Sequence, residues 1–79
     1  MIWRLQYAQA VIQKLYLLRE TGHALHAAIK ALAMLDQPWV GALSVTERPT
    51  QFEIESSGYW VGFEVVQDAK TIRVLYIEE

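Results

Sequence analysis

The stretch "GYWVGFEVVQDAKTIRVLYIEE", from Gly58 to Glu79, decides the fold of this chain. From residue 59 to residue 66, apolar side chains alternate with others, which is the period of a strand with one buried face. The segment "QDAK" is typical of a four-residue turn, and residues 71–77 form a nearly continuous apolar run broken by Arg73. The stretch therefore predicts a β-hairpin whose second strand is a central one, buried on both faces.

Another strand is expected just before this hairpin. Residues 51–55 alternate in the same way, and Ser57-Gly58 is typical of a tight turn between two strands. Residues 39–50 are interrupted by glycine and proline, so we interpret them as an ordered connector. The C-terminal half of the chain thus predicts a three-stranded meander.

The N-terminal half changes its period twice. Residues 2–7 alternate as a short strand does, whereas residues 8–20 and 23–36 each carry one apolar helical stripe. Thr21-Gly22 separates the two stripes, and glycine just past a helix end is a common stop signal. The expected fold class is α+β in the order β-α-α-β-β-β. A helical hairpin packs on one face of a small, mostly antiparallel sheet, with the first strand beside the last.

Length and composition limit the possible functions. The 79 residues fit a single domain over 1–79, and a hydrophobic fraction of 53% is high enough to leave apolar surface for a partner. The net charge of −2 argues against a strong, non-specific grip on nucleic acid. The absence of cysteine excludes disulfides and thiolate chemistry, and it is compatible with the cytoplasm. No targeting segment or membrane-spanning apolar run is evident.

The hairpin resembles that of the RelE/ParE superfamily, the toxins of bacterial type II toxin–antitoxin modules. The family pattern is Tyr-Arg-Val-x-Tyr-x-Val, an acidic turn, then Val-x-Val-Leu-x-Ile followed by His or Arg. Here the pattern opens with Tyr59, Trp60 and Val61, and it closes with "IRVLYI" over residues 72–77. The resemblance implies a RelE/ParE-like fold, a cytoplasmic toxin and a cognate antitoxin as its partner.

The departures from the family pattern concern catalysis. RelE-like members are ribosome-dependent mRNA endonucleases that use basic and polar side chains on the sheet face and near the C-terminus. An arginine there stabilises the charge that develops on the phosphate. Trp60 stands at that arginine position, and Glu78 and Glu79 stand where basic residues are expected. No catalytic residue is therefore carried over, and we expect RelE-type cleavage to be lost.

ParE-like members, which inhibit DNA gyrase, offer a further interpretation of the same hairpin. They have no comparable catalytic set, and their activity is associated with a C-terminal segment that is minimal here. We therefore expect binding to be the main activity, as a toxin-like component that binds a cognate antitoxin. The alternative is a non-toxic, dimerising or regulatory module of the same fold.

The expected strand register indicates a partner-binding surface. A regular ladder places Trp60 opposite Ile77, and Gly62 opposite Leu75. Trp60, Leu75 and Ile77 would then form an apolar cluster, ringed by charges, on the face turned away from the helices. Such a cluster is typical of a contact surface for another chain. The alternative is that the connector around Trp39 folds over it.

The charged side chains of the strands have a structural interpretation. The same register places Glu64 opposite Arg73, which predicts a cross-strand ion pair. Arg73 as a phosphate ligand is the weaker alternative. Glu53 and Glu55 share one face of a strand, and we interpret them as a solvated face rather than as an acid–base pair.

The two histidines are candidates for metal binding by spacing alone. His23 and His26 lie three residues apart on one predicted helix, which can place both imidazoles on one face. A zinc site needs further ligands, and the chain has no cysteine and no evident third ligand near them. We expect a solvated pair, with no metal and no cofactor.

Overall fold

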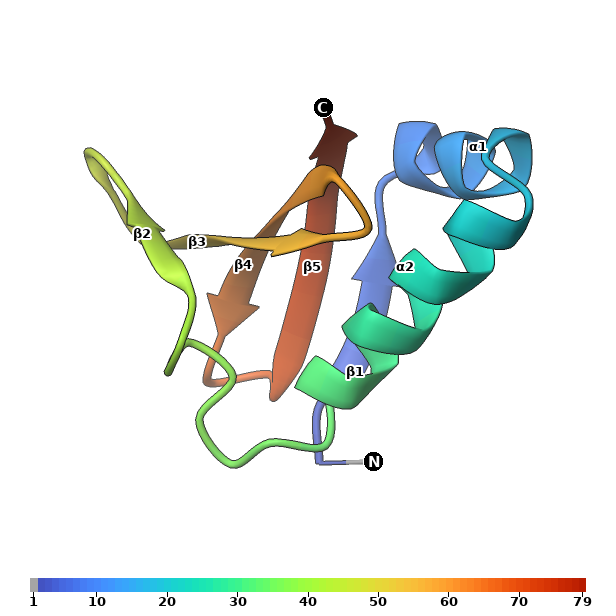
Figure 1. Cartoon of the computed structure of the whole chain (residues 1–79). Coiled ribbons are helices and arrows are strands. Elements are labelled where there is room, and N and C mark those ends of the chain that lie inside the picture. Colours follow the sequence, from blue (N-terminus) through green and yellow to red (C-terminus); the bar gives the residue numbers. More distant parts are fainter. Residues whose placement is uncertain (1) are drawn as a thin grey trace.

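A five-stranded mixed sheet carries two helices along one face (Figure 1). The structure is a computed structural model that describes residues 2–79. In chain order the elements are β1 (Arg4–Tyr7), α1 (Gln9–Leu17), α2 (Glu20–Leu32), β2 (Leu43–Val45), β3 (Arg48–Ser56), β4 (Tyr59–Val66) and β5 (Thr71–Glu78). The sheet order is β1-β5-β4-β3-β2. The predicted α+β class is confirmed, with one strand more than expected.

The strand pairing matches the prediction except at one edge. β1 lies beside β5 and runs parallel to it, whereas the other neighbouring strands are antiparallel. The additional strand, β2, lies within the predicted connector and pairs with β3. It is too short to show an alternating pattern of its own, so residue periodicity does not reveal it. β2 forms the outer edge of the sheet.

The boundary between the helices differs from the predicted one. The turn is made at Arg19, whose φ of 54° is in the left-handed region, and Gly22 lies inside α2 rather than after a helix end. A Cβ atom at Gly22 would stand 2.0 Å from the carbonyl oxygen of Leu15. Glycine is therefore needed for the close approach of α2 to α1, and not as a stop signal.

The core lies between the helices and one face of the sheet. One cluster lies toward the N-terminal end of β1, and its buried members are Trp3, Leu32, Ala33, Phe63, Val65 and Ile72. The second lies beneath α1 and the first half of α2, and its buried members are Val11, Leu25, Ile29, Val61, Val74 and Ile77. The sheet residues of both clusters define the covered face. Within residues 2–79 the opposite face carries no helix, and we call it the open face.

The two ladders of β4 differ in regularity. The β3–β4 ladder is continuous, and its turn has positive φ at Ser57 (55°) and Gly58 (82°), as the predicted tight turn requires. The β4–β5 ladder shifts between Gly62 and Phe63, which leaves Leu75 without a residue directly opposite it. This irregularity is a β-bulge, which adds one residue to one strand and reverses the faces beyond it.

The bulge overturns part of the predicted register. Trp60 pairs with Glu78, and Gly62 pairs with Tyr76, so the predicted opposition of Trp60 to Ile77 is wrong. Ile77 is only 7% exposed and belongs to the covered core. The bulge also explains the continuous apolar run in β5, because alternation restarts after it. β5 is not buried on both faces, since Arg73 is exposed on the open one.

Candidate functional site

The open face carries an aromatic ring between two carboxylates. Trp60 on β4 pairs with Glu55 on β3 and with Glu78 on β5, so the three side chains form one row across the sheet. Both glutamates are exposed, and Trp60 is partly buried. Within residues 2–79 the one ion pair joins Arg73 to Glu64, so neither carboxylate of this row is neutralised by a cation. The row presents apolar surface and negative charge together.

A tyrosine crosses the neighbouring row. The Tyr76 ring on β5 lies over Gly62 on β4, where a Cβ atom would stand 2.1 Å from the ring carbon Cζ. The Tyr76 hydroxyl donates a hydrogen bond to the Glu53 carboxylate on β3. Burial, the Glu53 hydrogen bond and the charges of Glu53 and Glu78 raise the pKa of Tyr76 to about 12. The hydroxyl therefore stays protonated across the physiological range.

Sequence analysis missed this row of the open face. The sequence pattern places Tyr76 within the apolar run of residues 72–77 and predicts no special role for Gly62. The usable signal was the glycine itself, because glycine inside a strand often marks a bulge or the close approach of another group. Both explanations hold here, since the bulge that follows Gly62 is what turns Tyr76 onto the open face.

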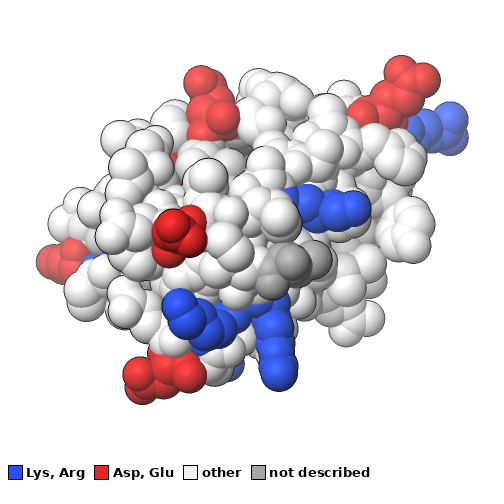
Figure 2. Space-filling model, turned by 90° about the horizontal axis from the view of Figure 1, so that it is seen from below, with Lys and Arg blue, Asp and Glu red and all other residues white. Residues whose placement is uncertain are grey.

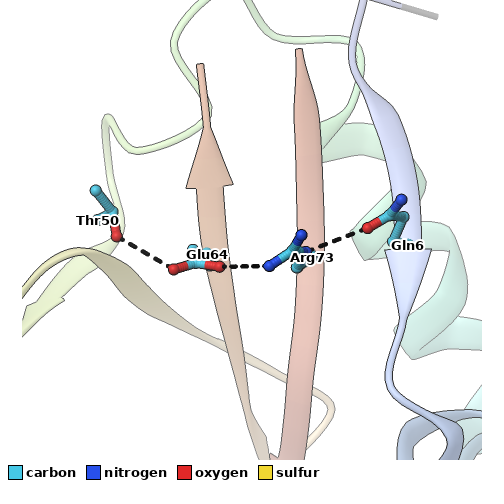
Figure 3. Close-up of polar contacts among 4 residues, drawn as sticks. All are labelled: Gln6, Thr50, Glu64 and Arg73. Atoms are coloured by element: carbon cyan, nitrogen blue, oxygen red, sulfur yellow. Dashed lines mark hydrogen bonds and ion pairs between the residues drawn. The ribbon is translucent and has the colours of Figure 1, made fainter. Parts of the chain in front are cut away.

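A chain of polar contacts crosses the third row, from β3 to β1 (Figure 3). The predicted opposition of Glu64 and Arg73 is confirmed, with 3.4 Å between the Arg73 guanidinium and a Glu64 oxygen. Arg73 also donates through Nε to Gln6 at 3.2 Å, and the Thr50 hydroxyl donates to the other Glu64 oxygen at 3.4 Å. Arg73 is thus held on both sides by groups of this chain.

The connector belongs to the covered face. Trp39 meets Trp3 edge-on, with ring centroids 6.1 Å apart and planes at 85°, and it packs against the cluster of the N-terminal end. The Trp3 indole donates to the Leu35 carbonyl at 2.8 Å. Trp39 therefore closes the end of the core and is not a lid over Trp60. Of the predicted contact residues, Ile77 is a core residue, Trp39 packs partly buried against the core, and Trp60 lies on the open face.

The remaining predicted features can be placed as well. Leu75 is partly buried at the bulge. Among residues 2–79, no group of three or more His, Cys, Asp and Glu side chains is arranged to hold a metal ion. No helix in that range is long and apolar enough to cross a membrane. His23 and His26 instead line a cleft between α1 and α2.

The charge pattern of the site is acidic. The open face carries the carboxylates of Glu53, Glu55, Glu64 and Glu78, together with the Arg73 guanidinium, which is paired with Glu64, and Arg4, which shares the face of Gln6 on the edge strand β1. Figure 2 views the molecule from below and shows Lys and Arg interspersed with Asp and Glu, so no field of one sign covers that side. An acidic face repels a phosphate backbone, whereas it suits a partner with apolar and cationic groups.

The comparisons with known proteins bear on the fold. No protein-family model matches the sequence, and no curated protein matches it. A solved structure of the Escherichia coli toxin RelE is similar over 100% of this chain and 84% of that one, with a TM-score of 0.74 and 19% sequence identity. That RelE carries two arginine-to-alanine replacements and is in complex with a peptide of the antitoxin RelBc. The chain described here therefore has the RelE fold, as the resemblance of its hairpin predicted.

Proposed function

We propose that this protein is the toxin-like component of a bacterial type II toxin–antitoxin module and acts mainly by binding protein. The fold supports the class, because a RelE-like architecture accounts for the whole chain. The similar RelE structure contains an antitoxin peptide, which supports a cognate antitoxin as the partner. The cytoplasm is the compartment that this function requires.

The row Glu55–Trp60–Glu78 is the observation that carries the proposed loss of RelE-type cleavage. It lies on the sheet face where RelE-like nucleases are expected to place basic groups. Phosphoryl chemistry needs positive charge at the developing oxyanion, and this row offers two carboxylates instead. Arg73 is the nearby cation, and Glu64 and Gln6 already bind it.

Mapping of mRNA ends after induction tests the proposed loss of cleavage. We expect primer extension to show no new cuts within translated regions. Induction of Escherichia coli RelE in the same strain, with the same transcripts, is the positive control. Codon-dependent cuts that appear with this protein would contradict the proposal.

Co-expression tests the proposed partner. The product of the adjacent reading frame should co-purify with this protein in a fixed ratio and should relieve any growth defect that its induction causes. A small protein with a DNA-binding N-terminal part would match an antitoxin. Absence of any complex with the adjacent product would contradict the antitoxin proposal.

A non-toxic, dimerising or regulatory module is the second candidate. The observation that favours it is the free edge of β2, where Leu43 is exposed next to unpaired backbone groups. Such an edge can pair with a second copy of the chain. Sedimentation equilibrium that shows a homodimer, together with unaffected growth on induction, would favour this candidate over the toxin-like one.

A further inference from the structure

The two helices enclose a cleft on the side of the molecule away from the open face. Its volume is about 310 Å³, which lies within the range of known ligand sites. Apolar side chains of α1 form one wall, namely Ile12, Leu15 and Tyr16. Basic and imidazole side chains from the turn and α2 form the other, namely Arg19, His23 and His26.

The backbone fixes how the two helices that line the cleft lie relative to each other. The contact of Gly22 with the Leu15 carbonyl fixes the distance between the helices at one end. The positive φ of Arg19 then sets the direction in which α2 leaves the turn. A cleft held in this way is largely pre-formed, so an occupant loses little free energy in organising it.

The charge of the lining has one sign. Arg19 contributes a guanidinium cation, His23 and His26 contribute imidazole groups, and among residues 2–79 no carboxylate lines the cleft. Glu20 follows Arg19 in sequence and does not line it. An occupant with a carboxylate beside an apolar group would therefore be complementary to this lining.

The apolar surface extends beyond the cleft. Two of the side chains that line it reach well into solvent, because Tyr16 is 81% exposed and Ile12 is 42% exposed. A small molecule confined to the cleft would leave most of this surface in water, whereas a segment of protein would cover it. The extent of the surface thus favours a protein segment as the occupant.

The floor of the cleft contains a polar group without a partner. The Tyr7 hydroxyl is buried and has no hydrogen-bond partner among residues 2–79, and its ring lies 5.8 Å from that of His26. Burial raises the pKa of Tyr7. A buried hydroxyl without a hydrogen bond costs free energy, so the hydrogen-bonding capacity of this region is not fully used in the isolated chain.

We propose that this cleft docks an amphipathic, acidic segment of a partner protein. Apolar side chains of the segment insert between α1 and α2 and cover Tyr16, while its carboxylates meet Arg19 and the two histidines. The inference rests on the proposed function in one respect, because it assigns a docking place to the protein partner. It also gives His23 and His26 a role, where the sequence predicted only a solvated pair.

Two synthetic peptides test the chemistry of the cleft without the natural partner. Both have about five helical turns and the same leucine stripe, and they carry glutamates or lysines beside the stripe. In NMR titrations of the ¹⁵N-labelled protein, the glutamate peptide should shift the signals of Tyr16, Arg19 and His23 and bind at least about tenfold more tightly than the lysine peptide. Equal affinities, or shifts on the open face instead, would overturn the inference.

Charge reversal at the rim supplies the matched comparison. Arg19→Glu and Tyr16→Glu should each weaken binding of the glutamate peptide by about tenfold or more. Lys30→Glu makes the same change of charge on an exposed residue of α2 outside the cleft, and it should leave the affinity unchanged. A Lys30→Glu effect as large as that of Arg19→Glu would mean that only net charge matters and would overturn the inference.

The natural partner separates failure of the inference from failure of the proposed function. If the adjacent gene product co-purifies equally well with Arg19→Glu, Tyr16→Glu and the parent protein, docking in the cleft is wrong and the proposed function stands. If it does not co-purify with the parent, the antitoxin proposal fails, and the peptide titrations still decide whether the cleft accepts an acidic segment. Weaker co-purification with both cleft variants, but not with Lys30→Glu, is the result we expect.

Discussion

The two ladders that flank β4 are both antiparallel, and they differ by a single bulge. Between β3 and β4, pairing runs without interruption from Gln51–Glu64 to Ser56–Tyr59. Between β4 and β5, it shifts after Gly62, and Leu75 has no residue directly opposite it. In the regular ladder, every second residue of a strand lies on the same face of the sheet from end to end. In the bulged ladder, strict alternation along β5 would assign the residues from Leu75 onward to the wrong face.

The bulge therefore changes what the open face is made of. A regular ladder would have put Leu75 and Ile77 beside Trp60, as an aliphatic patch. With the bulge, Ile77 packs in the core, while Tyr76 crosses Gly62 to reach Glu53. Bulges often re-aim side chains in this way next to functional surfaces. The open face becomes acidic and aromatic, which is the main structural reason to expect a partner rather than an RNA substrate.

The largest expected effect concerns the residue that the bulge moves into the core. Ile77→Ala should destabilise the protein by about 2–4 kcal/mol, because it leaves a cavity beside Val61 and Val74. Leu75→Ala should cost less, since Leu75 is only partly buried. Urea denaturation of both variants measures the free energy of unfolding.

The order of these two costs is what tests the bulge. Both variants remove comparable aliphatic volume from the same strand, so each serves as the control for the other. In a regular ladder, Leu75 and Ile77 would share the open face, and neither change would be costly. If Leu75→Ala destabilises the protein as much as Ile77→Ala or more, the bulged register is wrong.

Much of the fold could be predicted because it depends on alternation and on turn chemistry. The hairpin at Ser57-Gly58, the pairing of Glu64 with Arg73 and the place of β1 beside β5 all follow from patterns of a few residues. The predicted boundary between the helices is wrong for a physical reason. A glycine required for close packing and a glycine that ends a helix look alike in a single sequence.

The site was harder to predict because its key features are not local. The bulge is a shift in the pairing of β4 with β5 after Gly62, and the alternation of residues along each strand does not reveal it. The Tyr76–Glu53 hydrogen bond skips a strand, which is possible only because Gly62 has no side chain. The cleft between the helices likewise depends on the contact of Gly22 with Leu15.

Gly62→Ala is expected to have the second largest effect, on the open face alone. A methyl group there would collide with the Tyr76 ring, which can move away because it is the end of a side chain. The hydrogen bond to Glu53 should be lost, at a cost of about 1–2 kcal/mol, while the core keeps its packing. Spectrophotometric titration should show the pKa of Tyr76 falling from about 12 toward 10.

Two other observations complete the Gly62 test. NMR spectra of Gly62→Ala should keep the signals of Val61 and Phe63 near their parent positions, because both face the helices. Gly62→Ala that leaves the Tyr76 titration unchanged would show that the ring does not lie over Gly62. Global unfolding by this change would show that Gly62 supports the core and not only the open face.

Alkaline pH should reveal the same tyrosine through its contribution to stability. The pKa of Tyr76 is raised from 10 to about 12 in the folded protein, so folding favours the neutral phenol. This contribution is complete below pH 10 and is lost as pH rises through about 12. Unfolding free energies across that window should therefore fall more steeply for the parent protein than for Tyr76→Phe. Identical slopes would contradict the raised pKa.

A smaller effect is expected in the third row, where the regular pattern predicted the pairing correctly. Glu64→Arg and Arg73→Glu each place like charges opposite one another, and the double exchange restores opposite charges. The coupling free energy from the double-mutant cycle should be below about 1 kcal/mol, because the pair is exposed on one side. Coupling indistinguishable from zero would leave the pair without a structural role.

Trp60→Arg should change stability least, by about 0.5 kcal/mol or less, because position 60 lies on the open face. The same variant also tests which residues lie beside position 60. Beside Ile77, an introduced guanidinium would lose apolar contact and gain no charge partner. Beside Glu55 and Glu78, where the structure places position 60, it gains two carboxylates.

The stability of Trp60→Arg should therefore fall with added salt and fall again with Glu78→Gln, whereas the parent should respond weakly to both. If Glu78→Gln affects the parent and Trp60→Arg equally, position 60 does not face Glu78. If Trp60→Arg keeps its stability but binds the adjacent gene product more weakly than the parent does, Trp60 is a contact residue for a partner and not a support of the fold.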